Sequence, residues 1–240
     1  MDVNKNSYIF GFSAILVIVV AAILSFAAES LKPMQTENVR IEKMQNILAS
    51  VGVEATPKEA GKLFDQYIVD QKLLNHEGKV VEKDGLSAFD IDAVKQYKDK
   101  NLSDSEKYYP LFTFQNEEGK RYIVPMAGKG LWGPIWGYVA FAEDMNTIAG
   151  STFDHKTETP GLGAEIKEKF FTEKFIGKTI FEGDEFVSVE IVKGGQPWDS
   201  PHKVDGISGG TITSVGVGEM MERTLSVYVP YFKSNPKASL

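Results

Sequence analysis

The chain has 240 residues, 42% of them hydrophobic, which is enough to bury the core of one domain with appendages. Its net charge of −7 argues against nucleic acid as a partner, because a phosphate backbone requires a basic face. Cysteine is absent and the three histidines do not stand at zinc-site spacing, so we expect no disulfide, no cysteine-ligated iron–sulfur cluster and no metal site. Any electron transfer would therefore require an organic cofactor.

The first predicted element is a membrane-spanning helix within residues 1–30. Residues 8–28 carry no charge and are long enough to cross a bilayer. A cleaved signal peptide is the alternative, with Ser25 and Ala27 as small residues near a cleavage site. We favour a retained anchor, because the apolar stretch exceeds a usual signal core and the residues before it are barely basic. The balance of positive charges around the span weakly favours a cytoplasmic domain after it.

Residues 31–106 are predicted to form a membrane-proximal part made of helices and a hairpin. Pro33 suits the first position of an amphipathic helix that leaves the membrane. Thr56 and Glu59 have the spacing of a capping box, so a further helix is expected to begin at Thr56.

The hairpin of this part is predicted from two short strands, 68–74 and 79–82, on either side of a turn. Residues 85–104 are charged and poorly periodic, and we interpret them as a loop or a variable insertion.

A domain of residues 107–240 is predicted to contain a sheet of about five strands, a typical sheet size. The strands are expected at 109–115, 121–127, 135–142, 147–154 and 186–193. In the last of them Val187, Val189 and Ile191 alternate with polar residues. A helix lined by Ile166, Phe170, Phe171 and Phe175 is expected before it. The fold class is therefore α+β, a sheet packed on helices.

A glycine loop precedes the last predicted helix. Gly206, Gly209 and Gly210 allow positive φ and close approach of the backbone to a ligand. The helix is predicted from an apolar face that runs from Val217 to Tyr228, so it begins among the hydroxyls that follow the loop. The free N–H groups and positive end of such a helix suit a phosphate group. The structural alternative is a plain glycine turn with a serine or threonine N-cap.

The same loop matches G-x-S-x-G, the nucleophile elbow of serine hydrolases, with Ser208 as the nucleophile. All three histidines precede Ser208, which contradicts the Ser, acid, His order of that fold. A triad of His155, Asp184 and Ser208 in chymotrypsin order stays open, as a low-ranked alternative.

The stretch Asp205-Gly206-Ile207-Ser208-Gly209-Gly210-Thr211 resembles the flavinylation motif of the FMN-binding domain family. In that family the threonine that closes the motif carries FMN through a phosphoester bond, and Thr211 holds this position here. The family usually has alanine where this chain has Gly210, a change between small residues that we expect to leave attachment intact. The stretches 128–137 and 155–163, both rich in glycine, resemble the same family.

The resemblance implies an FMN site made from these three loops, with no catalytic residue and no metal ligand. In addition to Thr211, its expected residues are Asp205, Ser208, Gly209, Gly210, Ile212, Thr213, Leu131, Trp132, Glu158, Thr159, Gly161, Leu162 and Gly163. Leu131, Trp132 and Trp136 would cover the isoalloxazine ring by stacking and apolar contact, although tryptophan there is as often a core residue. The loop 159–163 would offer N–H groups, or would be a Pro-Gly type II turn.

Together with the single anchor, the motifs resemble the family formed by the C subunits of the Na⁺-translocating NADH:quinone reductases. The family implies an electron-relay subunit of a translocase in the inner membrane of a bacterium, with its C-terminal domain extracytoplasmic. It also implies membrane and NADH-oxidising partner subunits, a lipid bilayer around the anchor, and a flavin transferase for maturation. No G-x-G-x-x-G motif opens a βαβ unit, so NADH oxidation would fall to partners.

Two further interpretations stay open. The G subunit of the Rnf electron-transfer complex shares the Glu-Thr-Pro-Gly-Leu-Gly and threonine motifs. A membrane-tethered scaffold protein would carry no flavin at all.

Overall fold

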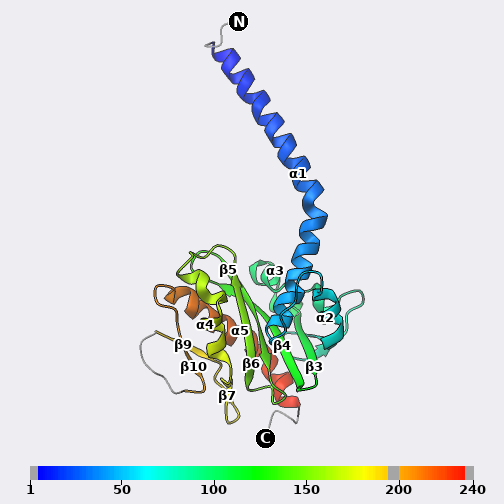
Figure 1. The fold of residues 1–240 in the computed structure, drawn as a ribbon, viewed down its shortest axis with the longest axis vertical. Coiled ribbons are helices and arrows are strands. Elements are labelled where there is room, and N and C mark those ends of the chain that lie inside the picture. The colour runs from blue at the N-terminus through cyan, green and yellow to red at the C-terminus, as the bar shows by residue number, and fades with distance from the viewer. Residues whose placement is uncertain (1–4, 194–199, 236–240) are drawn as a thin grey trace. The chain divides into compact units, whose positions relative to one another are not determined.

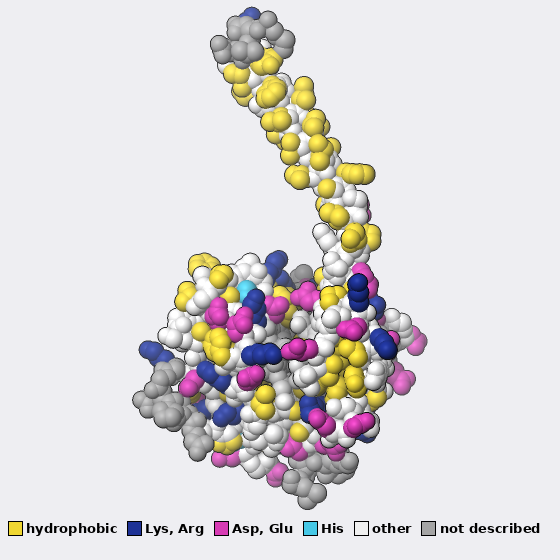
Figure 2. Space-filling view, viewed as in Figure 1, with side chains coloured by type: hydrophobic (Ala, Val, Ile, Leu, Met, Phe, Trp, Pro, Cys, Tyr) yellow, Lys and Arg dark blue, Asp and Glu magenta, His cyan; other side chains and the backbone are white. Residues whose placement is uncertain are grey.

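The computed structural model describes residues 5–193 and 200–235, and the chain separates into two units, Met1–Lys43 and Met44–Leu240. The first unit consists of most of helix α1 (Asn6–Ala49) (Figure 1). Its apolar part is long and hydrophobic enough to cross a membrane, as predicted for residues 8–28. Figure 2 shows hydrophobic side chains along this helix, and they are exposed from Ile9 to Leu24.

Pro33 lies inside α1, so the prediction that it begins a separate helix was wrong. Proline removes one intrahelical hydrogen bond, here the one that the carbonyl of Glu29 would accept, but the turns on both sides continue as one helix. The last turns of α1 belong to the second unit, where Met44, Ile47 and Leu48 are buried.

The second unit is built on one six-stranded antiparallel sheet with strand order β2-β1-β3-β4-β5-β6. The strands are β1 (Ile68–Leu74), β2 (Val80–Val81), β3 (Tyr109–Asn116), β4 (Gly119–Lys129), β5 (Pro134–Phe141) and β6 (Ile148–His155). The antiparallel α+β fold is confirmed, as are the hairpin of β1 and β2 and the four strands between residues 109 and 155. The hairpin belongs to the same sheet as these four strands.

Helices cover both faces of the sheet (Figure 1). On one face α5 (Thr211–Ser234) packs its apolar side, confirming the predicted helix face, and Val217, Leu225 and Phe232 are fully buried. Tyr228 is buried there as well, and its hydroxyl donates to the carbonyl of Pro110 at 2.7 Å. Burial raises the pKa of this hydroxyl well above its ordinary value, so it stays a hydrogen-bond donor.

On the opposite face, the last turns of α1 and helix α2 (Ala60–Tyr67) complete a second apolar layer, in which Phe64 of α2 lies edge-on to Phe112 of β3. Helix α2 begins at Ala60 and not at Thr56. The Thr56 hydroxyl donates to the Glu59 carboxylate at 2.6 Å instead of accepting a backbone N–H, so the predicted capping box is not formed.

Residues 85–104 are ordered into short helices and are not a loop, which corrects that prediction. The segment contains η1 (Ala88–Asp90), α3 (Ala93–Lys98) and the start of η2 (Asp104–Glu106). The side chains of Ser87 and Asp92 cap the first two. Each helix spans too few residues for an apolar period to appear, which is why the sequence pattern missed them.

Residues 186–193 do not join the main sheet, so the fifth predicted strand was wrong. They are divided between β8 (Glu185–Phe186), which pairs with β7 (Phe181–Glu182), and β9 (Glu190–Val192), which pairs in parallel with β10 (Lys203–Asp205). Ser188 interrupts the run with a φ of 58°, which an extended strand does not permit. Ser188 and Val189 are both buried, so the apparent alternation does not separate two faces.

The helix predicted around Ile166 to Phe175 is divided into three short pieces, η3 (Gly163–Lys167), α4 (Lys169–Thr172) and η4 (Glu173–Phe175). Phe171 and Phe175 are buried against Phe153 of β6, whereas Phe170 is exposed. The apolar residues are therefore core residues without forming one continuous helical face.

The closest approach between α1 and the sheet predicts a sensitive glycine. A Cβ atom at Gly150 in β6 would collide with the carbonyl oxygen of Ser50, just after α1. We expect Gly150→Ala to lower the free energy of unfolding by about 1–3 kcal/mol, measured by denaturant titration of the full chain in detergent.

The matched control is Gly61→Ala in α2, where a Cβ would meet nothing within 4 Å. Alanine favours a helix over glycine by about 0.5–1 kcal/mol, so this variant should unfold no more easily than the parent. Equal stability of the two variants would contradict the close contact at Gly150.

Candidate functional site

The threonine loop connects β10 to α5. Gly209 has a φ of 76°, and the N–H of Gly210 donates to the carbonyl of Ile207 at 3.0 Å, which closes a tight turn before Thr211. Neither serine nor threonine caps α5. Instead the Ser214 hydroxyl, one turn into the helix, accepts the N–H of Ile207 at 2.9 Å and donates to the carbonyl of Gly210 at 3.0 Å. The loop is therefore fixed from inside the helix.

The second loop, residues 159–163, packs directly against the threonine loop. A Cβ on Gly210 would lie 2.8 Å from the carbonyl oxygen of Leu162, and one on Gly209 would lie 2.6 Å from the Leu162 side chain. Both glycines are therefore required for the two loops to meet. Residues 159–162 form the predicted type II turn, with a Leu162 N–H to Thr159 carbonyl bond of 3.1 Å and a φ of 76° at Gly161.

The third loop is shorter than predicted, because β4 continues to Lys129 and β5 begins at Pro134. Only residues 130–133 turn the chain, and the N–H of Gly130 donates to the carbonyl of Gly133 at 2.8 Å. This turn presents Leu131 and Trp132 at the end of the β4–β5 hairpin, with 46% and 67% of their surfaces exposed.

Glu158 joins the three loops. Its side chain is 5% exposed, and one carboxylate oxygen accepts the N–H of Trp132 at 2.8 Å and that of Gly133 at 3.3 Å. The other oxygen accepts the hydroxyl of Thr213, in the first turn of α5, at 2.6 Å. A buried carboxyl group requires such donors, because its desolvation would otherwise be unfavourable.

Two glycines provide the space for the Glu158 carboxylate, because neither has a side chain. A Cβ on Gly130 would lie 2.6 Å from one carboxylate oxygen of Glu158, and a Cβ on Gly163 would lie 2.5 Å from the other. Gly163 also faces the Thr213 hydroxyl at the same distance. The glycines of these loops therefore serve the Glu158 network as well as the turns.

The loops enclose a pocket of about 220 Å³. Its lining residues are Leu131, Trp132, Glu158, Thr159, Leu162, Gly163, Gly209, Gly210, Thr211, Ile212 and Thr213. All of them were among the residues expected from the sequence. Three expected residues, Asp205, Ser208 and Gly161, do not line this pocket, and neither does Trp136, which lies half-buried in β5.

Asp205 ends β10 on the far side of the turn. One of its carboxylate oxygens is buried and has no hydrogen-bond partner among the described residues, while its backbone carbonyl accepts the Lys174 ammonium group at 3.2 Å.

The pocket fits a ligand with a flat apolar ring and an anionic group. Leu131, Trp132 and Ile212 expose large apolar surfaces at one place, which a stacked ring would cover. The start of α5 lies in the same pocket and provides free N–H groups and the positive end of the helix dipole. FMN combines these two features in one molecule.

A hydrolase triad is not formed. The Nδ1 atom of His155 accepts the N–H of Glu158 at 3.2 Å, which occupies the ring nitrogen that the triad acid would contact. Within residues 5–193 and 200–235, no hydrogen bond connects Ser208 to a histidine.

Comparisons with known proteins agree with this site. The model of the FMN-binding domain family matches residues 130–226. The C subunit of the Na(+)-translocating NADH-quinone reductase of Vibrio campbellii is 34% identical over 218 residues, which cover 84% of each chain. Its Pseudomonas aeruginosa counterpart is 32% identical over 230 residues, 87% of each chain.

Two solved structures share the fold. The crystal structure of the same reductase component from Parabacteroides distasonis is 42% identical, with a TM-score of 0.76 over 85% of this chain and 98% of that chain. The crystal structure of Shewanella oneidensis NqrC is 28% identical, with a TM-score of 0.67 over 82% of this chain and 98% of that chain.

The hydrogen bonds of Glu158 predict that two substitutions at this position differ strongly in their effect on the free energy of unfolding. Glu158→Ala leaves the buried Thr213 hydroxyl and the half-buried N–H groups of Trp132 and Gly133 without an acceptor, and we expect it to lower the free energy of unfolding by about 3 kcal/mol. Glu158→Gln keeps an oxygen for the Trp132 N–H and can donate its amide to the Thr213 hydroxyl, so the expected loss is about 1 kcal/mol or less. Denaturant titration measures both.

Glu117→Ala, on the exposed turn between β3 and β4, controls for loss of a carboxylate in general and should change stability by less than about 0.5 kcal/mol. If Glu158→Ala were as mild as this control, the three loops would be held by something other than Glu158.

Proposed function

Because this chain belongs to the family formed by the C subunits of the Na⁺-translocating NADH-quinone reductases, we propose that it carries FMN covalently on Thr211 and relays electrons between cofactors of partner subunits. The observation that carries the proposal is the convergence of three loops on the first residue of α5, in a pocket with exposed apolar walls. The flavin, when bound, supplies the redox chemistry, and the chain holds and shields it.

Thr211 and Thr213 lie in one pocket, and their surroundings support Thr211 as the attachment point. Thr213 is 1% exposed and its hydroxyl is engaged by Glu158. Thr211 is exposed, and its hydroxyl has no hydrogen-bond partner among the described residues. A phosphoester on Thr211 would therefore break no existing contact, and it would hold the phosphate at the positive end of α5.

A separate flavin transferase is part of the proposal. A threonine hydroxyl is a weak nucleophile unless a base activates it. None of the described residues hydrogen-bonds to the Thr211 hydroxyl, so the activating groups have to come from another protein. The exposure of Thr211 leaves that protein access to it.

The remaining chemistry is assigned to partner subunits. One apolar helix without charges between residues 8 and 28 offers no polar path for an ion, so Na⁺ would cross the membrane elsewhere in the complex. We propose that the chain is anchored by α1 in the inner membrane of a bacterium, with the flavin domain on the extracytoplasmic side. It would then contribute to a translocase without a complete active site of its own. The names of the relatives described above favour this complex over the Rnf-type alternative.

The attachment site is tested by in-gel fluorescence of the denatured chain after co-expression with a flavin transferase. We expect a fluorescent band for the parent and none for Thr211→Ala, because only a covalent flavin survives denaturation. Thr211→Ser, which keeps a hydroxyl at the same position, should retain part of the signal.

Ser208→Ala is the second control, because it alters the hydroxyl that a hydrolase would use and leaves Thr211 intact. It should fluoresce like the parent. A fluorescent Thr211→Ala band would move the attachment elsewhere, and a dark parent band would overturn the covalent flavin.

The proposed orientation is testable because the chain contains no cysteine. Glu117→Cys places a single thiol on an exposed turn of the domain, and Asn6→Cys places one at the exposed start of α1. In spheroplasts, a membrane-impermeant maleimide should label the first variant and should label the second only after lysis. The reverse pattern would place the flavin domain in the cytoplasm.

A further inference from the structure

A second, larger pocket lies further along α5. Its volume is about 360 Å³, and it shares no lining residue with the first pocket. Arg223 in its wall follows Thr211 by twelve positions on α5, about 18 Å along the helix axis. The other walls come from β4, α3, the start of β3 and the segment from η2 to β3, with His76 of the β1–β2 turn.

The pocket combines aromatic walls with an apolar floor. Its lining includes Tyr97, Tyr108 and Tyr109, together with the apolar residues Met126 and Val227. The Tyr108 ring is also faced by the Lys83 ammonium group, 4.6 Å from its centre. This composition is typical of sites for small organic molecules, which pair apolar walls with a few directing polar groups.

Arg223 is the directing group. Its guanidinium carbon lies 4.6 Å from the centre of the Tyr97 ring, and one terminal nitrogen donates to the carbonyl of Ala127 at 2.6 Å. Across residues 5–193 and 200–235, no carboxylate forms an ion pair with it. The stacking and the single hydrogen bond hold the guanidinium plane in place and leave further N–H donors free.

Two more charges lie beside it. The Lys107 ammonium group contacts the Asp104 carboxylate at 2.7 Å, and the Asp104 side chain is 80% exposed, so its charge is well solvated. Burial raises the pKa of the Tyr109 hydroxyl, Lys107 and Arg223 oppose that rise, and Asp104 adds to it. Two cations and one anion therefore lie around Tyr109 at the pocket, and His76 lines the same pocket.

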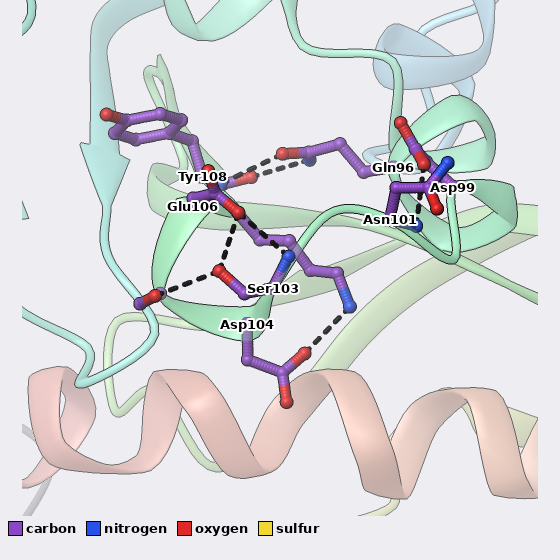
Figure 3. Close-up of polar contacts among 9 residues, drawn as sticks. Gln96, Asp99, Asn101, Ser103, Asp104, Glu106 and Tyr108 are labelled. Carbon is purple, nitrogen blue, oxygen red and sulfur yellow. Dashed lines mark hydrogen bonds and ion pairs between the residues drawn. The ribbon is translucent and has the colours of Figure 1, made fainter.

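The wall opposite α5 is well ordered. The Gln96 amide donates to the carbonyl of Tyr108 at 2.8 Å and accepts its N–H at 2.9 Å. Figure 3 shows these bonds with those of Ser103 to Glu106, and it shows the Asp104 carboxylate pointing from the segment toward the ribbon of α5. The pocket is formed by structured elements and not by a free loop.

We propose that this pocket binds a small aromatic carboxylate, with its ring among the tyrosines and its carboxylate on the Arg223 guanidinium. A planar guanidinium fork matches a carboxylate, and the cationic excess of the pocket favours an anion in a chain whose net charge is −7. A phosphate group fits less well, because the pocket is lined by the middle of α5 and lacks the free N–H groups of a helix start. This inference is independent of the flavin proposal.

Benzoate is the probe, and the methionine methyl groups of the full chain, labelled with ¹³C, are the reporters. Met126 lines this pocket, whereas Met44 and Met145 do not. Benzoate should shift the Met126 resonance with a dissociation constant in the millimolar range, and leave Met44 and Met145 in place. Benzamide has the same shape without the charge and should bind about tenfold more weakly, and inorganic phosphate should not compete.

Two variants test the charges in opposite directions. Arg223→Gln should weaken benzoate binding about tenfold, while Lys62→Gln, which removes an exposed cation in α2, should leave it unchanged. Asp104→Asn removes an exposed anion near the pocket and should tighten binding about twofold, a gain that damage to the fold would not produce. Equal binding of benzamide, or full binding by Arg223→Gln, would overturn the proposal, as would an unmoved Met126 resonance at saturating benzoate.

Discussion

The buried carboxylate of Glu158 is the constraint on which the site depends. A carboxyl group that is 5% exposed must find donors within the protein, and it takes them from the 130–133 turn and from the first turn of α5. Three segments that are far apart in sequence thereby converge at the start of one helix. Gly130 and Gly163 follow from the same constraint, since a side chain at either position would occupy the space of the carboxylate.

The helices and strands that could be predicted from the sequence are those with an apolar face or run that continues through the whole element. Helix α5 and strands β3 to β6 were predicted because an apolar face or an apolar run extends through each of them. Residues 186–193 look like a strand, but a positive φ at Ser188 ends the extended run. Ser188 and the neighbouring Val189 are both buried in the tertiary structure, a burial that the local alternation of residues does not reveal. The short helices η1, α3 and η2 were missed for the opposite reason. Their caps are local, but with three to six residues each helix is too short for an apolar face to repeat along it.

The site shows a similar division. The residues around Thr211 were expected from motif resemblance, and the structure gathers ten of them with Thr211 in one pocket. Asp205 belongs to the motif and is not among the residues that line that pocket. The contributions of Gly130 and Ser214 were missed. Gly130 leaves room for the Glu158 carboxylate, and Ser214 forms hydrogen bonds with its own loop. Neither role can be recognised from the sequence, because the partner of each residue is known only from the structure.

The network also bears on the order of events in maturation. The hydrogen bonds from Trp132, Gly133 and Thr213 to Glu158 connect the three loops through groups of the protein. The proposed acceptor Thr211 is the first residue of α5, is exposed, and forms no hydrogen bond with Glu158. The hydroxyl of Thr213, by contrast, donates to Glu158. Attachment would then add a ligand to a site that is already ordered, and the entropy of ordering the loops would not oppose that step. Covering Leu131, Trp132 and Ile212 with a ring would stabilise the modified protein further, at roughly 25 cal/mol for each Å² of apolar surface removed from water. Under the proposed attachment, the arrangement that leaves Thr211 exposed to a transferase would also make the modified form the more stable one.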